Sequence, residues 1–268
     1  MDADKPRPAD VAAKYDSAEP RAWGYDLPGI VKALDPSSTS IALTFDACGG
    51  PHGSLIDDPL LALLEQQAVP ATLFWNKRWI EQNPQRALHL AQNPLFQIEN
   101  HGTLHKPLSV NGRAAYGIPG TESAAELVEE IEGNRRFLRE FLDVESNWFR
   151  SGTAFYDDVA VDIARELGVT LPGTAVASHL RQAAPGAIVL MHMNQPGRGT
   201  ADGVREAIPQ LREAGFTFAK LGGGAGVGGV RAVGVAKRGS VSVPFLRDGC
   251  RFCFRSSSRL RGGGCGVN

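Results

Sequence analysis

The sequence predicts an α/β fold built on a parallel sheet. Short apolar runs alternate with longer segments whose apolar residues repeat at helical spacing, and the runs end in polar or glycine residues. The composition agrees, because 268 residues with 43% apolar and 21% charged residues are typical of a globular protein with a large core. Seven such runs indicate a sheet that is open or closed into a barrel.

The first strand is predicted at residues 41–45, where Ile-Ala-Leu-Thr-Phe is nearly continuously apolar, as in a strand buried on both faces. A helix follows at 55–67, with four leucines on its buried side. The same alternation predicts strands at 71–75, 96–99, 146–149, 169–171, 187–191 and 216–219. Between them, helices are predicted at 79–91, 124–142, 157–167 and 203–214.

Both ends of the chain differ from this pattern. Residues 1–38 are rich in Pro, Asp and Lys and are predicted to form an irregular arm, held to the body by Trp23, Tyr25 and Leu27. Residues 39–221 form the predicted domain. Residues 222–268 contain 13 glycines and are predicted to be disordered, because they bury too little apolar surface to offset chain entropy. A shifted reading frame in GC-rich DNA would also produce this tail composition.

The charge is divided unequally along the chain, although the total is only -1. Residues 1–221 carry 20 Lys and Arg against 28 Asp and Glu, and residues 222–268 carry eight against one. The acidic body excludes nucleic acid as its expected partner. No run is apolar enough for a transmembrane segment, and the N-terminus lacks signal-peptide features. We therefore expect a cytoplasmic protein as written, or a periplasmic or secreted one if a signal was removed.

Chemistry-bearing side chains follow four of the predicted strands. Asp46 follows the first strand, His101 and His105 follow the third, Arg150 the fourth and His192 the sixth. Because the carboxyl ends of parallel strands face one crevice, we expect these residues to meet there. His101 and His105 are four residues apart, which on a helical turn lets both rings bind one cation.

Each residue also has a structural interpretation when it is taken alone. Two histidines at this spacing often occur as unrelated surface or core residues. The others would be a turn cap for Asp46, an ion-pair partner for Arg150, a buried hydrogen-bonded ring for His192, and a small buried side chain for Cys48.

Four segments together carry a family pattern. Residues 44–49 match T-F-D-D-G in part, residues 101–105 match H-[ST]-x-x-H with Gly102 at the Ser/Thr position, Arg150 begins a reduced R-x-P-x-G, and residues 188–192 match I-V-L-x-H. In order and spacing they resemble the NodB-homology polysaccharide deacetylases of carbohydrate esterase family 4. The resemblance covers roughly residues 40–221 and implies a distorted, incomplete (β/α) barrel of about seven parallel strands.

The resemblance implies hydrolysis of N-acetyl groups on the amino sugars of a polysaccharide or oligosaccharide. His101 and His105 would hold a divalent metal, with Zn²⁺ the first choice, which activates water and polarises the acetyl carbonyl. Asp46 would take the proton of the water, His192 would donate one to the leaving amine, and Arg150 would orient Asp46.

The chain departs from the family pattern at several positions. The second aspartate of the first motif, a metal ligand in the family, is Ala47, so the third ligand stays open, with Asp46 ranked ahead of Cys48. The proline and aromatic residue of the third motif are absent, and no fourth motif occurs between Leu171 and Pro185. The alternatives are a catalytically impaired, saccharide-binding barrel, and an O-acetyl esterase or other amidase on the same fold.

Overall fold

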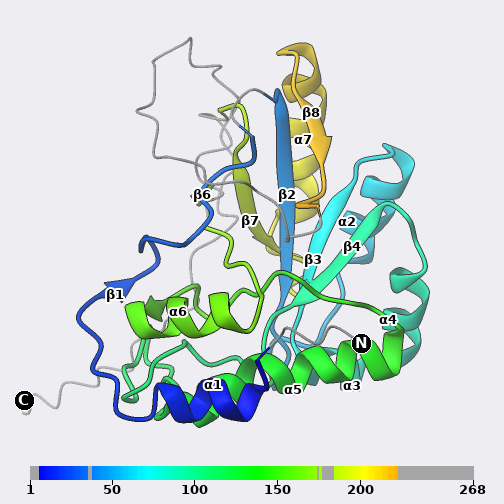
Figure 1. Cartoon of the computed structure of the whole chain (residues 1–268). Coiled ribbons are helices and arrows are strands. Elements are labelled where there is room, and N and C mark those ends of the chain that lie inside the picture. Colours follow the sequence, from blue (N-terminus) through cyan, green and yellow to red (C-terminus); the bar gives the residue numbers. More distant parts are fainter. Residues whose placement is uncertain (1–5, 36–37, 174, 177–183, 223–268) are drawn as a thin grey trace, which may run out of the picture.

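The computed structural model describes residues 6–35, 38–173, 175–176 and 184–222, so the predicted tail lies outside the described residues except for Gly222. A parallel sheet forms the centre of the molecule, with strand order β4-β3-β2-β7-β6 and with β8 also paired to β2 (Figure 1). These strands are β2 (Ser40–Ala47), β3 (Ala71–Trp75), β4 (Phe96–Asn100), β6 (Ala175–Val176), β7 (Ile188–His192) and β8 (Thr217–Ala219).

Strand β2 is central because its sequence suits burial on both faces. It pairs in parallel with β3 and β8 along one edge and with β7 along the other. Its side chains alternate: Leu43, Phe45 and Ala47 belong to the largest hydrophobic cluster, whereas Thr44 and Asp46 are buried polar residues on the opposite face. One strand thus contributes both to the core and to a polar interior.

The sheet continues beyond β4 as isolated bridges. Asn100 pairs with Phe149, and Trp148 pairs with Thr170, in place of the continuous strands predicted at 146–149 and 169–171. The Glu99 carboxylate accepts the backbone N–H groups of Asn147 (3.0 Å) and Trp148 (2.9 Å), which removes these donors from a regular ladder. These pairings and the parallel sheet confirm the predicted distorted, incomplete barrel.

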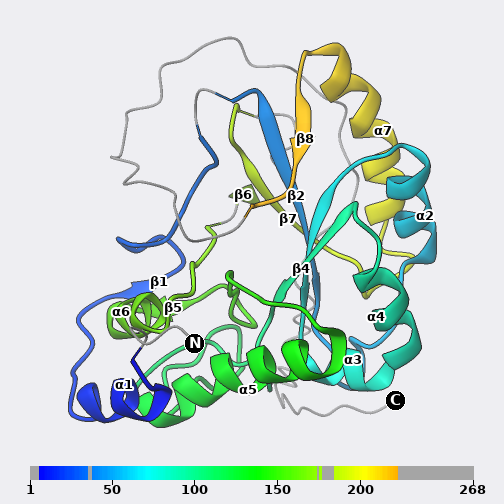
Figure 2. The ribbon, with the colours of Figure 1, turned by 45° about the vertical axis from the view of Figure 1, so that its right-hand side comes forward.

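In the described part of the chain, six helices follow the N-terminal segment and accompany the sheet: α2 (Asp58–Gln66), α3 (Lys77–Gln82), α4 (Pro84–Ala91), α5 (Ala124–Leu142), α6 (Asp158–Glu166) and α7 (Thr200–Glu213). Helices α2, α4 and α7 lie on one side of the sheet, and α5 runs across one end (Figure 2). The single helix predicted at 79–91 was wrong. Pro84 disfavours helical backbone at Asn83, which ends α3 with φ -129° and ψ 46°, and α4 begins at the proline.

The N-terminal segment contains regular structure, so the prediction of an irregular arm was wrong there. Helix α1 (Pro8–Lys14) packs beside α5, and its Val11 side chain is only 1% exposed (Figure 1). Strand β1 (Trp23–Gly24) pairs antiparallel with β5 (Tyr156–Asp157). The rings of Trp23 and Tyr25 lie 5.7 and 5.6 Å from that of Phe155, and Leu27 is buried, so the predicted contacts of these residues with the body are confirmed.

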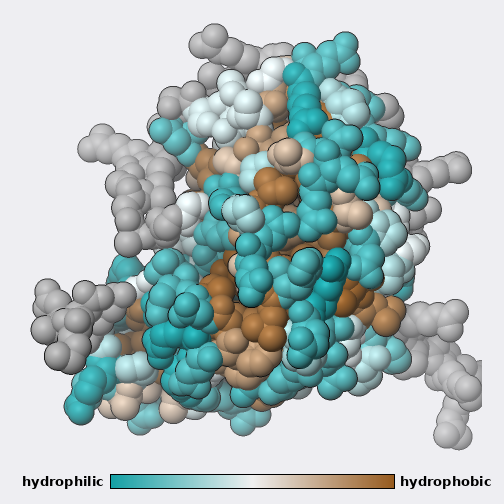
Figure 3. Space-filling view, turned by 90° about the vertical axis from the view of Figure 1, so that its right-hand side faces the viewer, coloured by the Kyte–Doolittle hydropathy of each residue, from teal (hydrophilic) through white to brown (hydrophobic). Residues whose placement is uncertain are grey.

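On the face turned toward the viewer in Figure 3, hydrophilic side chains surround a central apolar area. No helix in the described part of the chain is long and apolar enough to cross a membrane.

Candidate active site

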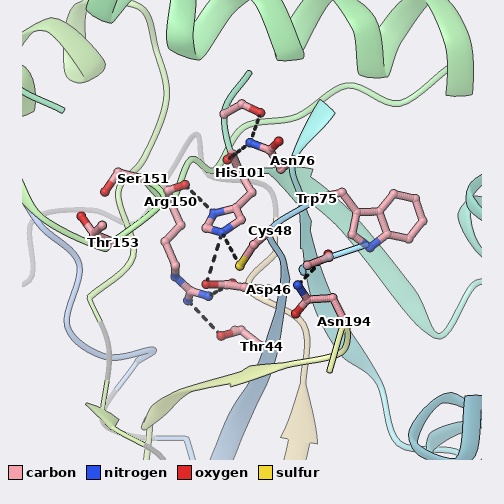
Figure 4. A network of polar contacts seen from close by, with 12 residues as sticks. Thr44, Asp46, Cys48, Trp75, Asn76, His101, Arg150, Ser151, Thr153 and Asn194 are labelled. Carbon is pink, nitrogen blue, oxygen red and sulfur yellow. Dashed lines mark hydrogen bonds and ion pairs between the residues drawn. The ribbon is translucent and has the colours of Figure 1, made fainter. Parts of the chain in front are cut away.

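Polar side chains converge at the carboxyl end of the sheet (Figure 4). Asp46 lies near the end of β2, directly opposite His192, the last residue of β7. His101 follows β4, and Arg150 follows the short bridge at Phe149. The sheet thus brings together residues that are up to about 150 positions apart in the sequence.

Arg150 binds the Asp46 carboxylate inside the protein. Its Nη1 donates to Asp46 Oδ1 at 2.6 Å, and its Nη2 donates to Thr44 Oγ1 at 2.9 Å. The guanidinium also lies over the Phe74 ring, 4.2 Å from the centroid. Because Arg150 is fully buried and Asp46 is 3% exposed, this ion pair holds the carboxylate in one orientation.

The surroundings keep Asp46 ionised. Burial by itself raises the pKa of this carboxyl, but the Arg150 charge, electrostatic interactions with the His101 and His192 rings and the hydrogen bond from Arg150 outweigh it. The pKa of Asp46 therefore lies below its ordinary value. Asp46 can accept a hydrogen bond or a proton from a group placed beside it.

A backbone carbonyl sets the orientation of His101. The ring Nδ1 lies 2.8 Å from the carbonyl oxygen of Arg150, and since a carbonyl only accepts, Nδ1 donates the proton. In the neutral ring, Nε2 then carries a lone pair. It faces Asp46 Oδ2 and Cys48 Sγ, each at 3.7 Å.

His105 reaches the same point from a loop. The segment from 101 to 105 is not helical, and His105 has φ 65°, so the predicted sharing of one helical turn was wrong. The two rings nevertheless lie 4.8 Å apart at 84° to each other. His105 Nε2 is buried and has no hydrogen-bond partner among the described residues, which leaves it available to a bound group.

Buried asparagines hold this loop in place. Asn76 Nδ2 donates to the carbonyls of His101 (3.0 Å) and Gly102 (2.8 Å). Asn100 Oδ1 accepts from the Gly102 N–H and from Asn134 Nδ2, both at 2.8 Å. These asparagines belong to no motif that predicts a role for them. The one signal was their position, because Asn76 and Asn100 end or directly follow buried strands.

Glu130 explains why glycine stands at position 102. Gly102 has φ +83°, and a Cβ there would lie 2.3 Å from Glu130 Oε1. The same carboxylate accepts the N–H groups of Leu104 (2.9 Å) and Lys106 (3.1 Å). Burial raises the pKa of Glu130 to about 7 against these hydrogen bonds. The Glu130 carboxyl of α5 therefore occupies the space that a larger residue at position 102 would need.

Cys48 also lies at this site, although the sequence analysis favoured an ordinary buried role for it. Gly49 and Gly50 follow it with φ 69° and 80° and turn the chain away from the strand. Burial and the Asp46 charge raise the pKa of the Cys48 thiol, while Asn194 and Arg78 act in the opposite direction.

Among the described residues, one group of three side chains has metal-ligand geometry. Cys48, His101 and His105 each offer one ligand atom, and these atoms all lie within 4.8 Å of one another. Burial lowers the pKa of His101 and, more strongly, that of His105, so both rings are neutral, as metal ligation requires. Together with the unpartnered His105 nitrogen, this donor set fits a divalent transition metal such as Zn²⁺.

His192 faces the same interior from β7. Burial lowers its pKa, and the Arg150 charge lowers it further, against the opposing effect of Asp46. The ring is therefore neutral near pH 7 and carries one N–H. Its position opposite Asp46 in the sheet gives the site two neighbouring titratable residues.

A family model described as polysaccharide deacetylase matches residues 33–172, just over half of the chain. An uncharacterized protein from Bacillus subtilis, YlxY, is 22% identical over 175 residues, which cover 60% of this chain and 50% of the relative. The chain thus spans about half the length of this curated relative.

Solved structures with the same fold include a family 4 carbohydrate esterase from Bacillus anthracis. It is 22% identical, with a TM-score of 0.59, over 80% of this chain and 88% of that one. Another is BA3943 from Bacillus anthracis, described as a family 4 pseudoenzyme, which is 21% identical with a TM-score of 0.60 over 73% and 68% of the two chains. At these identities the similarity establishes the fold.

Proposed function

The chain belongs to the polysaccharide deacetylase family, and from this membership we propose that it removes N-acetyl groups from amino sugars of a polysaccharide or oligosaccharide. The observation that supports this most is the buried Asp46–Arg150 ion pair beside the paired rings of His101 and His105. Binding a sugar does not require an ionised acid, an orienting arginine and two neutral histidines together at one end of the sheet.

A divalent metal, with Zn²⁺ the best fit, would bind at His101 and His105 and would supply an activated water and a polarised acetyl carbonyl. His101 is prepared for this role because the Arg150 carbonyl holds the proton on Nδ1.

Asp46 accepts the proton of the attacking water in this mechanism. The Arg150 ion pair keeps the carboxylate charged and fixes Oδ1, so Oδ2 stays directed toward His101 and the reacting water. A positioned base of this kind contributes about 10²–10⁴-fold to the rate.

His192 returns that proton to the leaving amine. A neutral His192 gains the proton that originates from the water and passes it to the nitrogen as the carbon–nitrogen bond breaks. The hydroxyl of water is then in acetate and its proton on the free amine, which balances the reaction. The adjacent register positions of Asp46 and His192 support this transfer.

The test measures release of free amine and of acetate from an acetylated chito-oligosaccharide by the purified full chain, after chelation and after zinc is restored. We expect amine release that zinc restores, and an Asp46→Asn variant slower by about 10²–10⁴-fold. Asp58→Asn is the matched control, because Asp58 is an acid at the start of α2 that pairs with Arg86 away from the site.

The alternatives give different results in the same assay. Acetate release from O-acetylated sugars without amine release would indicate an esterase. No turnover by a folded, zinc-supplied protein would contradict the proposal and favour a saccharide-binding barrel, a role to which Ala47 and the fold shared with a described pseudoenzyme lend support.

A further inference from the structure

We propose that Cys48 is the third protein ligand of the metal site, so that the metal is held by one thiolate and two imidazoles. This inference rests on the proposed function and deepens it, because it replaces the missing carboxylate ligand with sulfur. The cluster that carries it is compact, with Cys48 Sγ 3.7 Å from His101 Nε2 and within 4.8 Å of the His105 ligand atom.

The alternation of side chains along β2 explains why residue 48 replaces residue 47. Asp46 faces the polar interior, Ala47 is fully buried in the hydrophobic cluster, and Cys48 faces the interior again. Ala47 therefore has neither a ligand atom nor a side chain on the site-facing side. The next residue on the site-facing side supplies a donor atom instead.

The turn after β2 holds Cys48 at this position. Gly49 has φ +69°, and a Cβ there would lie 2.6 Å from the backbone nitrogen of Trp79. The turn closes through the Gly49 N–H, which donates to the carbonyl of Gly53 at 2.9 Å. Glycine adopts this left-handed backbone without a steric clash, so the chain turns directly after Cys48. The cysteine therefore stays beside the end of β2.

Asp46 is less suited to be the third ligand. Its Oδ1 is occupied by Arg150 at 2.6 Å, and its carboxylate does not belong to the group of atoms that lie within 4.8 Å of one another. His105, by contrast, contributes a ligand atom to that group, and its Nε2 is buried without a hydrogen-bond partner in the described part of the chain. A thiolate with two imidazoles is a donor set that zinc accepts at sites with one open position. On binding, the thiol proton leaves to solvent and a sulfur–metal bond forms.

The experiment uses the full chain with Cys250, Cys253 and Cys265 changed to Ser, so that Cys48 is the sole thiol. The probe is Co²⁺ in place of zinc, because a cobalt–thiolate bond gives a charge-transfer band in the near ultraviolet and cobalt bound by nitrogen and oxygen does not. We expect this band at one cobalt per chain. Zinc affinity, measured by competition with a chromophoric chelator, is read in parallel.

Two substitutions at the cysteine are compared with one at the rival ligand. Cys48→Ser should abolish the band and weaken zinc binding by at least about 100-fold, since even outer-shell partners are worth about 10–100-fold. Cys48→Asp should keep zinc binding within about 10-fold and lose the band. Asp46→Asn should keep both. Circular dichroism establishes that each variant is folded, and Cys48→Asp carries the test if Cys48→Ser does not fold.

Three results would overturn the inference: no metal binding by the parent, cobalt binding without the band, or zinc affinity that falls in Asp46→Asn and not in Cys48→Ser. Failure of the proposed function appears differently. A cobalt–thiolate band without turnover of any acetylated sugar would support Cys48 as a metal ligand and contradict the deacetylase function. Zinc-dependent amine release without the band would contradict Cys48 as a metal ligand and support the deacetylase function.

Discussion

Single residues of the site act on more than one neighbour. The Arg150 guanidinium binds Asp46 and Thr44, and its backbone carbonyl accepts the His101 Nδ1 proton. The orientation of the base and that of one imidazole therefore depend on the same residue. Gly102 has a comparable double constraint, because its φ of +83° requires the left-handed region and Glu130 occupies the space a side chain would need.

Gly102→Ser, which introduces the family residue, should therefore destabilise the protein. Left-handed backbone costs a residue with a Cβ about 1–2 kcal/mol, and crowding against buried Glu130 should add about 1–3 kcal/mol. The measurement is the free energy of unfolding in urea. Gly215→Ser is the matched control, because Gly215 has φ +85° with nothing within 4 Å of the added Cβ. Equal losses in the two variants would contradict the role assigned to Glu130.

Among the elements, α6 shows how a helix start is fixed by one side chain. Asp157, the last residue of β5, accepts the N–H of Ala160 at 2.6 Å as the N-cap and that of Val110 at 2.8 Å. The cap therefore joins the helix to the loop that precedes α5. Through β5, which pairs with β1, it also connects to the N-terminal segment.

Asp157→Ala should lower the free energy of unfolding by about 2–4 kcal/mol, because a lost N-cap costs about 0.5–2 kcal/mol and the unpaired Val110 N–H about 1–3 kcal/mol. Asp157→Asn keeps an acceptor oxygen and should lose less than half as much. Urea unfolding of the three proteins at one pH measures both effects. An Asn variant as unstable as the Ala variant would exclude the capping explanation.

The Asp157 carboxyl also predicts a pH dependence. Burial is the largest influence and raises its pKa above the ordinary 3.8, despite the hydrogen bonds from Val110 and Ala160. The folded state thus binds this proton more tightly than the unfolded chain. The resulting stability is present below pH 3.8 and is lost as the pH rises through the folded pKa. The stability of wild type relative to Asp157→Asn should fall as the pH rises from about 4 through the folded pKa of Asp157. A relative stability that rises with pH would contradict this prediction.

At the scale of the whole molecule, the proposed metal ligands come from separate parts of the barrel. Residue 48 follows β2, and His101 and His105 lie in the loop after β4, with β3 between these strands. A metal bound there links two segments that the unfolded chain leaves apart. Binding energy therefore contributes to the stability of the fold, although the core does not require it.

Zinc should raise the unfolding temperature of the chelated protein. At 100 times the dissociation constant, binding stabilises the folded state by about 2.7 kcal/mol, and for a domain of this size that corresponds to about 5–10 °C. Differential scanning fluorimetry with and without zinc measures the shift, and chelator should reverse it. His105→Ala should remove most of the response, and an undiminished shift in that variant would place the zinc elsewhere.

Much of the fold could be predicted from the sequence where the signal is local. The strand at 71–75 and the helix at 124–142 have the predicted ends, because apolar period and polar boundaries lie within each segment. Pro84 is also a local signal for the break between α3 and α4, although a single helix was predicted there. The isolated bridges at residues 148–149 could not be predicted from the local sequence. Their geometry depends on the Glu99 carboxylate, which accepts backbone N–H groups about 50 residues away.

The sequence by itself determined the parallel α/β architecture, the family, and the placing of Asp46, His101, Arg150 and His192 at strand ends, because each depends on local pattern or motif order. The tertiary structure alone decided that Cys48 lies with the two histidines and that Gly102 leaves room for Glu130. These facts are distances between segments far apart in the chain. They arise from the packing of the barrel, and local periodicity does not encode them.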